Sequence, residues 1–437
     1  MSIAPPSQAA SRIVTARLPG VAGVSSSPAF PVRLLFAFFI IFCFPAFTIQ
    51  LAMDSTGRWV GSPVLQMITI STELFVFAFI LLSRNIRSLV LQCWPVLALV
   101  AVAFISAAWS RHASATIQAS NTHMTAALLG LTIVGAFPGF QSVKFIIRVM
   151  ALGCLLSALW VLLFPEVAVH QLSDPYQTVH AGLWRGIFSH KQGLGYFAGL
   201  TTGLLLFYRT SIAPAPIWFF FLACSVTCLV GTQSATGIVT SVITPTFLYA
   251  AYFIARLRVP LRKPMFIKFA IAVVAVGLGF RSGILDYVIV QILGKSTDLT
   301  GRADFWPIIL QNFHSSGSSF LGGGFGANIA ADMSEWSVDN GYLDKFLEFG
   351  YLSSPIVFVA YAAILWGSIR LVLNTPTELA RANIFPFAIW SVILIVNISE
   401  SNFMTKCLST VLTSMAVGLI FQQKQSIRFV HREQRSR

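Results

Sequence analysis

Charge is what this sequence has least of. Only 10% of its 437 residues are Asp, Glu, Lys or Arg, whereas 56% are hydrophobic, and the mean hydropathy is +0.77. Soluble domains carry about 25% charged residues, so this composition excludes an ordinary water-soluble surface. Apolar runs recur at a spacing of ~20 residues, which is the length that crosses a bilayer core. We therefore expect one all-α integral membrane domain.

Acidic residues are the scarcer of the two charges. The chain has 15 Asp and Glu against 29 Lys and Arg, a formal net charge of +14, and no acid precedes Asp54. The basic residues are spread over short segments between apolar runs and form no stripe with interleaved aromatics, which argues against nucleic-acid binding. The acid-free stretch 1–31 is rich in Ala, Ser and Pro. We expect a disordered cytoplasmic tail ahead of an uncleaved signal-anchor helix.

Sequence patterns for disulfides, metals and nucleotides are also missing. All six cysteines lie in or beside apolar runs, and Cys224 and Cys228 are one helical turn apart rather than in CxxC spacing. The seven histidines are scattered and form no HxH or HxxxH pair. The run Gly322–Gly326 lacks the Lys and Ser or Thr that follow in a nucleotide-binding loop. We expect no cofactor and no protein-bound metal.

The apolar runs predict twelve transmembrane helices, divided nine and three by a long polar segment. They lie at 32–52, 64–83, 93–110, 122–140, 145–164, 193–208, 215–231, 235–255, 264–280, 350–373, 383–398 and 404–422. The first nine fill 32–280 and include an external loop at 165–192. The last three fill 350–422, ahead of a basic cytoplasmic tail at 423–437. The segment 281–349 holds eight of the fifteen acids, and we expect it to form a helical external cap.

The distribution of Lys and Arg predicts the orientation. If the N-terminus is cytoplasmic, 20 of the 29 basic residues lie in cytoplasmic segments, although the external segments are longer. Cytoplasmic loops of membrane proteins carry such an excess. We expect both termini in the cytoplasm, with 165–192 and 281–349 outside.

Two arginines on the predicted outer face are candidates for binding an anion. Arginine recognises phosphate with two parallel hydrogen bonds, which points to Arg185 and Arg302, with Lys191 near the first. Each has a structural alternative. Arg185 and Lys191 are alternatively interfacial residues that extend toward headgroups, and Arg302 is alternatively a turn residue paired with Asp298 or Asp304.

Carboxylates and glycines supply the other candidates. Gly324, in the middle of the glycine run, allows a close approach of backbone or substrate. Asp339 is either the N-cap of the helix that contains Tyr342 or a group that accepts a proton. Glu73 lies well within an apolar run and Glu400 near an outer end. Intramembrane acids are functional candidates, so they keep a transporter open as an alternative.

Seven short motifs follow one another between about 180 and 402. They are Arg185–Gln192, Thr232–Gly237, Leu299–Trp306, Leu321–Gly326, Asp339–Leu343, Glu348–Gly350 and Asn397–Ser401. In this order, and with the long external segment in the expected place, they resemble the O-antigen ligase and polymerase superfamily. The branch they most resemble is that of exopolysaccharide-production polymerases.

The resemblance implies a metal-independent glycosyltransferase that uses a lipid-linked donor outside the inner membrane. Arg185 and Arg302 would hold the pyrophosphate of an undecaprenyl-pyrophosphate-linked glycan. The position of Asp339 is commonly His in the ligase branch, where it activates the acceptor, so the carboxylate here favours a polymerase. Residues expected to contact substrate are Lys191, His190, Asn340, Tyr342, Glu348 and Gly324.

Chemistry supports the same assignment of roles. Departure of a pyrophosphate needs cations where negative charge develops, and the acceptor hydroxyl needs a base, for which Asp339 is the candidate and Glu348 the alternative. Expected partners are the lipid-linked donor, a glycan acceptor, membrane lipid, a chain-length-regulating membrane protein and export machinery. The alternatives are an O-antigen ligase that transfers glycan to lipid A-core, a flippase of lipid-linked sugars, and an accessory subunit without catalysis.

Overall fold

The computed structural model describes residues 28–43, 63–173, 180–281, 302–317, 319–327, 338–404 and 408–436. Over these residues the chain is helical, apart from an isolated antiparallel bridge between Val169 and Trp184. The predicted all-α class is therefore confirmed. Most of the predicted tail 1–31, and the parts 282–301 and 328–337 of the predicted cap, lie outside the described residues.

Helices occupy nearly all of the described chain. In the N-terminal part they are α2 (Phe30–Cys43), α4 (Pro63–Leu82), α5 (Arg84–Gln92), α6 (Trp94–Ile105), a 3₁₀ turn (Ser106–Ala108), α7 (Ala113–Ala136), α8 (Phe140–Leu163) and the short α9 (Pro165–Ala168). They continue as α10 (Lys191–Ile212), α11 (Ala215–Thr232), α12 (Ala235–Arg256), α13 (Val259–Arg281) and α15 (Arg302–Ser315). The last are α17 (Gly341–Asn374), a 3₁₀ turn (Thr377–Leu379), α18 (Ala380–Asn383), α19 (Phe385–Val396) and α20 (Leu408–Ser436).

Several of these helices can cross a membrane. Four of the described helices are long and apolar enough, namely α8, α11, α12 and α17, and the bent pair α4 and α5 raises the number to five. Four shorter apolar stretches lie at Phe30–Ile41, Trp94–Ala108, Ala380–Val396 and Leu408–Gln423. The chain is thus a multi-pass membrane protein. Each of the twelve predicted spans overlaps a helix, but fewer than twelve are identified as spans, so that number stays a prediction.

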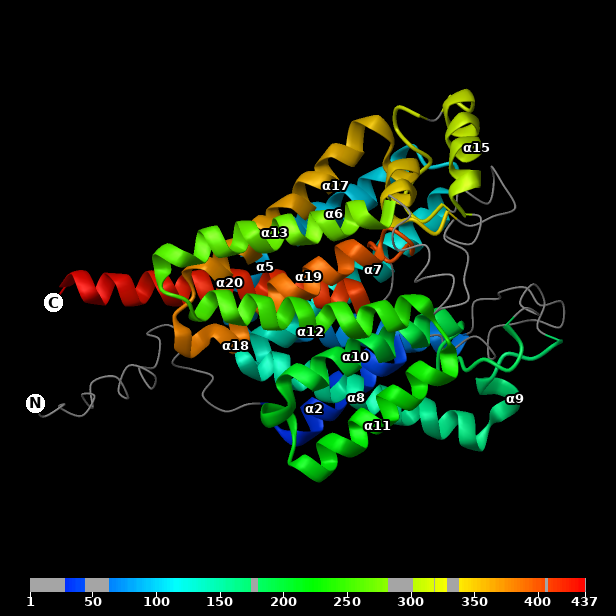
Figure 1. Cartoon of the computed structure of the whole chain (residues 1–437). Coiled ribbons are helices and arrows are strands. Elements are labelled where there is room, and N and C mark those ends of the chain that lie inside the picture. The colour runs from blue at the N-terminus through cyan, green and yellow to red at the C-terminus, as the bar shows by residue number, and fades with distance from the viewer. Residues whose placement is uncertain are drawn as a thin grey trace, which may run out of the picture.

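The helices run between two ends of the molecule (Figure 1). One end carries α9 and α15, and we call it the α15 end. The other, the α18 end, carries α18 and the projecting last turns of α20. At the α18 end the hydroxyl of Tyr208 donates to Arg381 O at 2.9 Å, and Arg262 Nη1 donates to Thr375 O at 2.7 Å. Loops predicted to be cytoplasmic therefore meet at this end.

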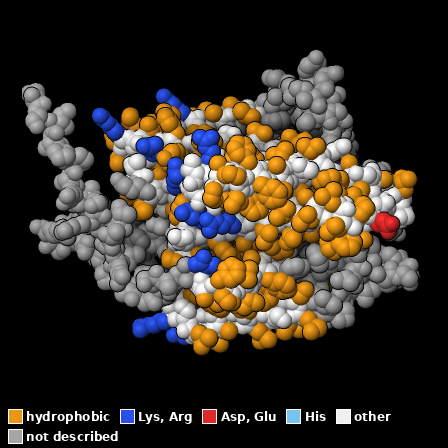
Figure 2. Space-filling view, turned by 90° about the horizontal axis from the view of Figure 1, so that it is seen from below, with side chains coloured by type: hydrophobic (Ala, Val, Ile, Leu, Met, Phe, Trp, Pro, Cys, Tyr) orange, Lys and Arg blue, Asp and Glu red, His pale blue; other side chains and the backbone are white. Residues whose placement is uncertain are grey.

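The surface agrees with a bilayer-embedded body. Figure 2 shows an extensive apolar face, with Lys and Arg side chains gathered in a band across it toward one end. Many large apolar side chains are exposed on the helices, among them Leu162, Phe219 and Val274, which are 73%, 62% and 60% exposed. Lipid, rather than water, is the environment in which such a surface is stable.

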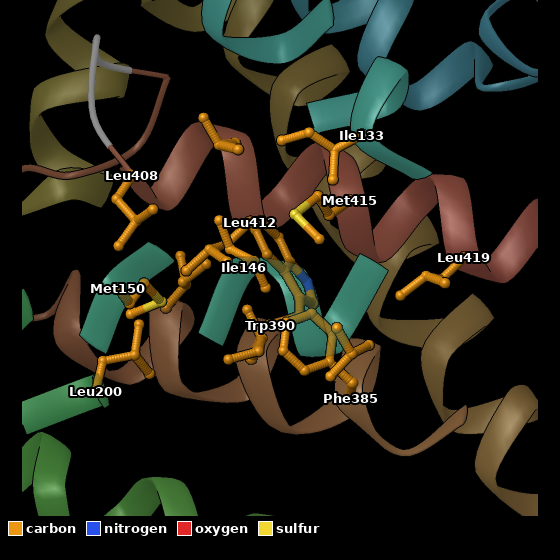
Figure 3. Packing of buried hydrophobic residues seen from close by; sticks show 14 of the residues in the cluster. Ile133, Ile146, Met150, Leu200, Phe385, Trp390, Leu408, Leu412, Met415 and Leu419 are labelled. Carbon is orange, nitrogen blue, oxygen red and sulfur yellow. The ribbon is translucent and has the colours of Figure 1, made fainter. Parts of the chain in front are cut away.

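Close helix packing builds the interior. Figure 3 shows part of the buried cluster, where Leu412 and Met415 of α20 lie near Ile133 of α7 and Trp390 of α19. Helix α10 crosses α12 where Gly199 meets the backbone of Gly237, so a side chain at Gly199 would collide with it. Small residues at such crossings are typical of helices packed inside membranes.

Two sequence features set the ends of helix segments. Pro386, which interrupts an apolar run, lies in the first turn of α19, where the missing N–H costs nothing. Gly350 has φ 59° and ψ −168°, so it breaks α17 into a short segment, 341–349, and a long one, 351–374. The predicted helix that contains Tyr342 and the predicted span at 350–373 correspond to these two segments.

Candidate functional site

The loop before α10 folds back against α9 and α11. Arg185 N and Gly186 N both donate to Ala168 O at 2.9 Å, and Trp184 N donates to Gly231 O at 2.9 Å. The side chain of Arg185 is only 7% exposed, and its Nε donates to Val167 O at 2.8 Å. Arg185 is therefore anchored inside the loop. The alternative that it is an interfacial residue extending toward the headgroups does not agree with this burial.

Three histidines meet in this loop. The ring centroids of His170, His180 and His190 are 5.0 to 5.7 Å apart, with the rings edge to face. His190 is the N-cap of α10, and its Nδ1 accepts from Gln192 N at 3.2 Å. Nε2 of His170 accepts from Lys191 N at the same distance. The prediction that the histidines are scattered is wrong for these three.

The gathering of these histidines depends on tertiary structure. His170 N donates to Leu183 O and Gly182 N donates to His170 O, and these bonds bring the two parts of the loop that carry His170 and His180 together. A spacing of ten in an irregular loop carries no sequence signal. Among the residues that the structure describes, no group of three His, Cys, Asp or Glu is arranged to hold a metal ion.

The start of α17 meets the loop after α19. Gly341 N donates to Asn397 O at 2.8 Å and to Glu400 O at 3.0 Å, and Asn340 Nδ2 donates to Ile398 O at 3.2 Å. The carboxylate of Glu400 accepts a hydrogen bond from Thr236 Oγ1 at 2.9 Å. Three of the seven motifs, Thr232–Gly237, Asp339–Leu343 and Asn397–Ser401, are thus joined. Glu400 belongs to this cluster at the helix ends.

Asn340, and not Asp339, caps α17. Asn340 Oδ1 accepts from Tyr342 N and Leu343 N, both at 3.0 Å. Asp339 precedes the cap, is half-buried and has φ 41°, a left-handed conformation in which Asp and Asn are enriched. The capping alternative for Asp339 is therefore wrong. Its carboxylate does not cap the N-terminus of α17.

Tyr342 fastens this segment to α19. Its hydroxyl donates to Leu394 O at 2.9 Å, and its ring packs edge to face on Phe403 with centroids 5.1 Å apart. These contacts give Tyr342 a positioning role next to Asp339. The structure does not test its predicted contact with substrate.

A buried ion pair follows one turn later. Lys345 is 1% exposed and its Nζ lies 2.5 Å from Glu348 Oε2 and 3.2 Å from Asp344 Oδ2. The second oxygen of Glu348 accepts from Gly326 N at 2.9 Å. Lys345 Nζ also stands 5.0 Å from the centre of the Phe325 ring. Sequence reasoning missed Lys345, although its position three residues before Glu348 on one helix was a signal.

The glycine run wraps the end of the short segment 341–349. Gly323 N donates to Leu347 O and Gly324 N to Glu348 O, both at 3.0 Å. Gly324 has φ +99°, and a Cβ there would collide with the side chain of Ser110. A close approach of backbone to backbone occurs at Gly322, where a Cβ would collide with the backbone of Glu348 and Gly350. The run acts as a clasp on α17.

Helix α15 brings Arg302 into the same region. Arg302 is its first residue, and its side chain lies outside what the structure describes. Farther along, Trp306 Nε1 donates to Val338 O at 3.0 Å, while Ile309 and Phe313 pack with Val338 and Leu347. The helix that begins at Arg302 is therefore packed against the residue next to Asp339.

These contacts link the ordered motifs into one region at the α15 end. The loop of Arg185 contacts the end of α11, Thr236 contacts Glu400, Glu400 contacts Gly341, and Glu348 contacts the glycine clasp. The region contains the anchored Arg185 with His190 and Lys191, and the carboxylates of Asp339, Glu348 and Glu400. No family model matches the chain, and no curated protein is similar to it.

Proposed function

We propose that this protein polymerises undecaprenyl-pyrophosphate-linked oligosaccharide repeat units on the outer face of the bacterial inner membrane. It would be a member of the O-antigen ligase and polymerase superfamily, with twelve spans and both termini in the cytoplasm. The observation that carries the proposal is the convergence of the ordered motifs, scattered over more than half of the chain, at the α15 end of a membrane-embedded helical body.

The proposed reaction is a glycosyl transfer. The oxygen of an acceptor hydroxyl forms a bond to the anomeric carbon of the donor, and the bond from that carbon to the pyrophosphate oxygen breaks. Its electron pair leaves with the pyrophosphate, where Arg185 and Arg302 balance the developing charge. The hydroxyl proton passes to Asp339. No nucleotide sugar takes part, because the donor already carries its leaving group.

Asp339 is preferred over Glu348 as the base. Both oxygens of Glu348 accept hydrogen bonds, from Lys345 and from Gly326. A carboxylate held in this way positions the glycine clasp. Asp339 is half-buried and lies outside the cap of α17. It is the carboxylate that an acceptor can reach from the α15 end.

Deletion of the gene distinguishes a polymerase from an O-antigen ligase. Loss of a polymerase leaves single lipid-linked repeat units in the membrane, whereas loss of an O-antigen ligase leaves long lipid-linked chains that are never transferred. We expect single units. The accumulation of long chains would assign the protein to the ligase branch.

Transport of lipid-linked sugars is a second candidate, favoured by one observation. Glu73 lies within α4, and Oε1 of its carboxylate accepts from Asn121 Nδ2 at 2.5 Å and from Thr125 Oγ1 at 3.0 Å. An acid held between membrane helices is a feature of ion-coupled transporters. In reconstituted vesicles a transporter would move the lipid-linked repeat across the bilayer without lengthening it.

A further inference from the structure

A small cavity lies inside the helical body beside the candidate site, since Phe403 in its wall packs on Tyr342 and on Tyr361. Its volume is about 20 Å³. Its polar lining comes from His123 of α7, Tyr361 of α17, Asn402, and Thr410, Thr413 and Ser414 of α20. Apolar residues complete it, including Trp390 of α19, which is labelled in Figure 3.

Two buried side chains in its wall lack partners. His123 is 3% exposed, and neither of its ring nitrogens has a hydrogen-bond partner among the residues that the structure describes. Tyr361 is 4% exposed, and its hydroxyl likewise has no hydrogen-bond partner among the described residues. A buried polar group without a partner costs about 1–3 kcal/mol, so native proteins rarely keep one. Two in the wall of one cavity point to a guest that hydrogen-bonds to both.

The chemistry of the wall identifies the guest. The volume is close to that of one water molecule and far below that of a sugar or a phosphate, since a water needs ~10–15 Å³ of such space. None of the described residues of the lining is an acid. A positive charge is also nearby, because Lys345 lies over the ring of Phe325, and the centre of that ring is 5.7 Å from the centre of the His123 ring. A cation is therefore disfavoured. A neutral imidazole and a phenol can each donate a hydrogen bond to a water molecule and accept one from it.

We infer that this cavity is a binding site for one water molecule, which bridges His123 and Tyr361. The water holds α7 to α17 where both pack near α20. This role of the water is independent of the glycosyl transfer proposed above.

The sign of one stability change tests the inference. Tyr361→Phe keeps the ring and removes only the hydroxyl. If the water is bound, the variant loses a hydrogen bond, and its unfolding equilibrium constant in detergent micelles rises about 2- to 13-fold, which corresponds to ~0.5–1.5 kcal/mol. The matched control is Tyr208→Phe, because Tyr208 is 1% exposed and its hydroxyl donates to Arg381 O. We expect both variants to be less stable by similar amounts.

A Tyr361→Phe variant as stable as the wild type, or more stable, would overturn the inference, because the hydroxyl would then be unsatisfied in a dry cavity. A double-mutant cycle with His123→Phe gives a second test. A shared water predicts that the two losses do not add. Additive losses in the His123 cycle would show that no guest joins the two residues.

Discussion

Asp339 and Asn340 are neighbours with different roles in the fold. Asn340 supplies the oxygen that caps α17, whereas Asp339 stands just outside the helix with φ 41°. Since either Asp or Asn caps a helix about equally well, sequence alone could not assign the cap to one of them. The structure assigns the cap to Asn340, and the proposed acid–base role of Asp339 is tested by substitution.

Asp339→Asn is expected to abolish most of the turnover without loss of stability. Asparagine tolerates the left-handed conformation and leaves the cap at Asn340 untouched, but it cannot accept a proton. Turnover of a lipid-linked donor by the purified protein should fall by ~10²-fold or more, and Asp339→His should retain part of it. As a control for capping, Asn340→Ala should lower the free energy of unfolding by about 0.5–2 kcal/mol. Full activity of the Asn variant would remove Asp339 from the mechanism and turn attention to Glu348.

Arg302→Lys is expected to lose most activity while the protein still inserts into the membrane. Lysine keeps the charge but not the planar, two-pronged geometry that fits a pyrophosphate. The length of the exported polysaccharide measures the effect. Arg370→Lys is the matched control, because Arg370 is an exposed residue near the other end of α17. Near-normal chain length in the Arg302 variant would make this arginine a turn residue only.

At the scale of elements, the site depends on a clasp between the glycine run and the first segment of α17. The clasp needs Gly324 for two separate reasons, which are its positive φ and its contact with Ser110. Gly317 has only the first, because its φ is +71° and nothing lies within 4 Å of a Cβ built there. The two glycines therefore form a matched pair.

Gly324→Ala is expected to destabilise the protein more than Gly317→Ala. Both alanines are strained by ~1–3 kcal/mol of backbone energy, and only Gly324→Ala adds a collision. Thermal unfolding of the purified variants measures the difference, and Ser110→Gly in the Gly324→Ala background should recover the part due to the collision. An equal loss of stability in both variants would mean that the Ser110 side chain moves aside without cost and that the predicted collision is absent.

At the scale of the whole molecule, the loops sort to opposite ends. Segments predicted to be external meet at the α15 end, and those predicted to be cytoplasmic meet at the α18 end (Figure 1). Reporter fusions at Ser316 and Arg262 should therefore report opposite compartments, with Arg262 in the cytoplasm. Both fusions in one compartment would contradict the orientation.

Hydrophobic run length predicted the helices well, because crossing a bilayer demands apolar length that is visible residue by residue. The absence of side chains in the glycine run correctly indicated a close approach there, because only glycine fits such a contact. It missed the Lys345–Glu348 pair and the meeting of His170, His180 and His190, since each depends on how distant segments pack. The alternative that Asp339 caps its helix failed by one residue, because neighbouring Asp and Asn carry the same local signal.

Chain growth by the purified protein tests the central claim most directly. The protein in detergent or vesicles is given undecaprenyl-pyrophosphate-linked repeat units, with a chelator present and no nucleotide sugar, and the lipid-linked products are sized. The account predicts a ladder of longer lipid-linked chains, the release of undecaprenyl pyrophosphate, and loss of both in Asp339→Asn. Donor that remains as single units in the presence of intact wild-type protein would contradict it.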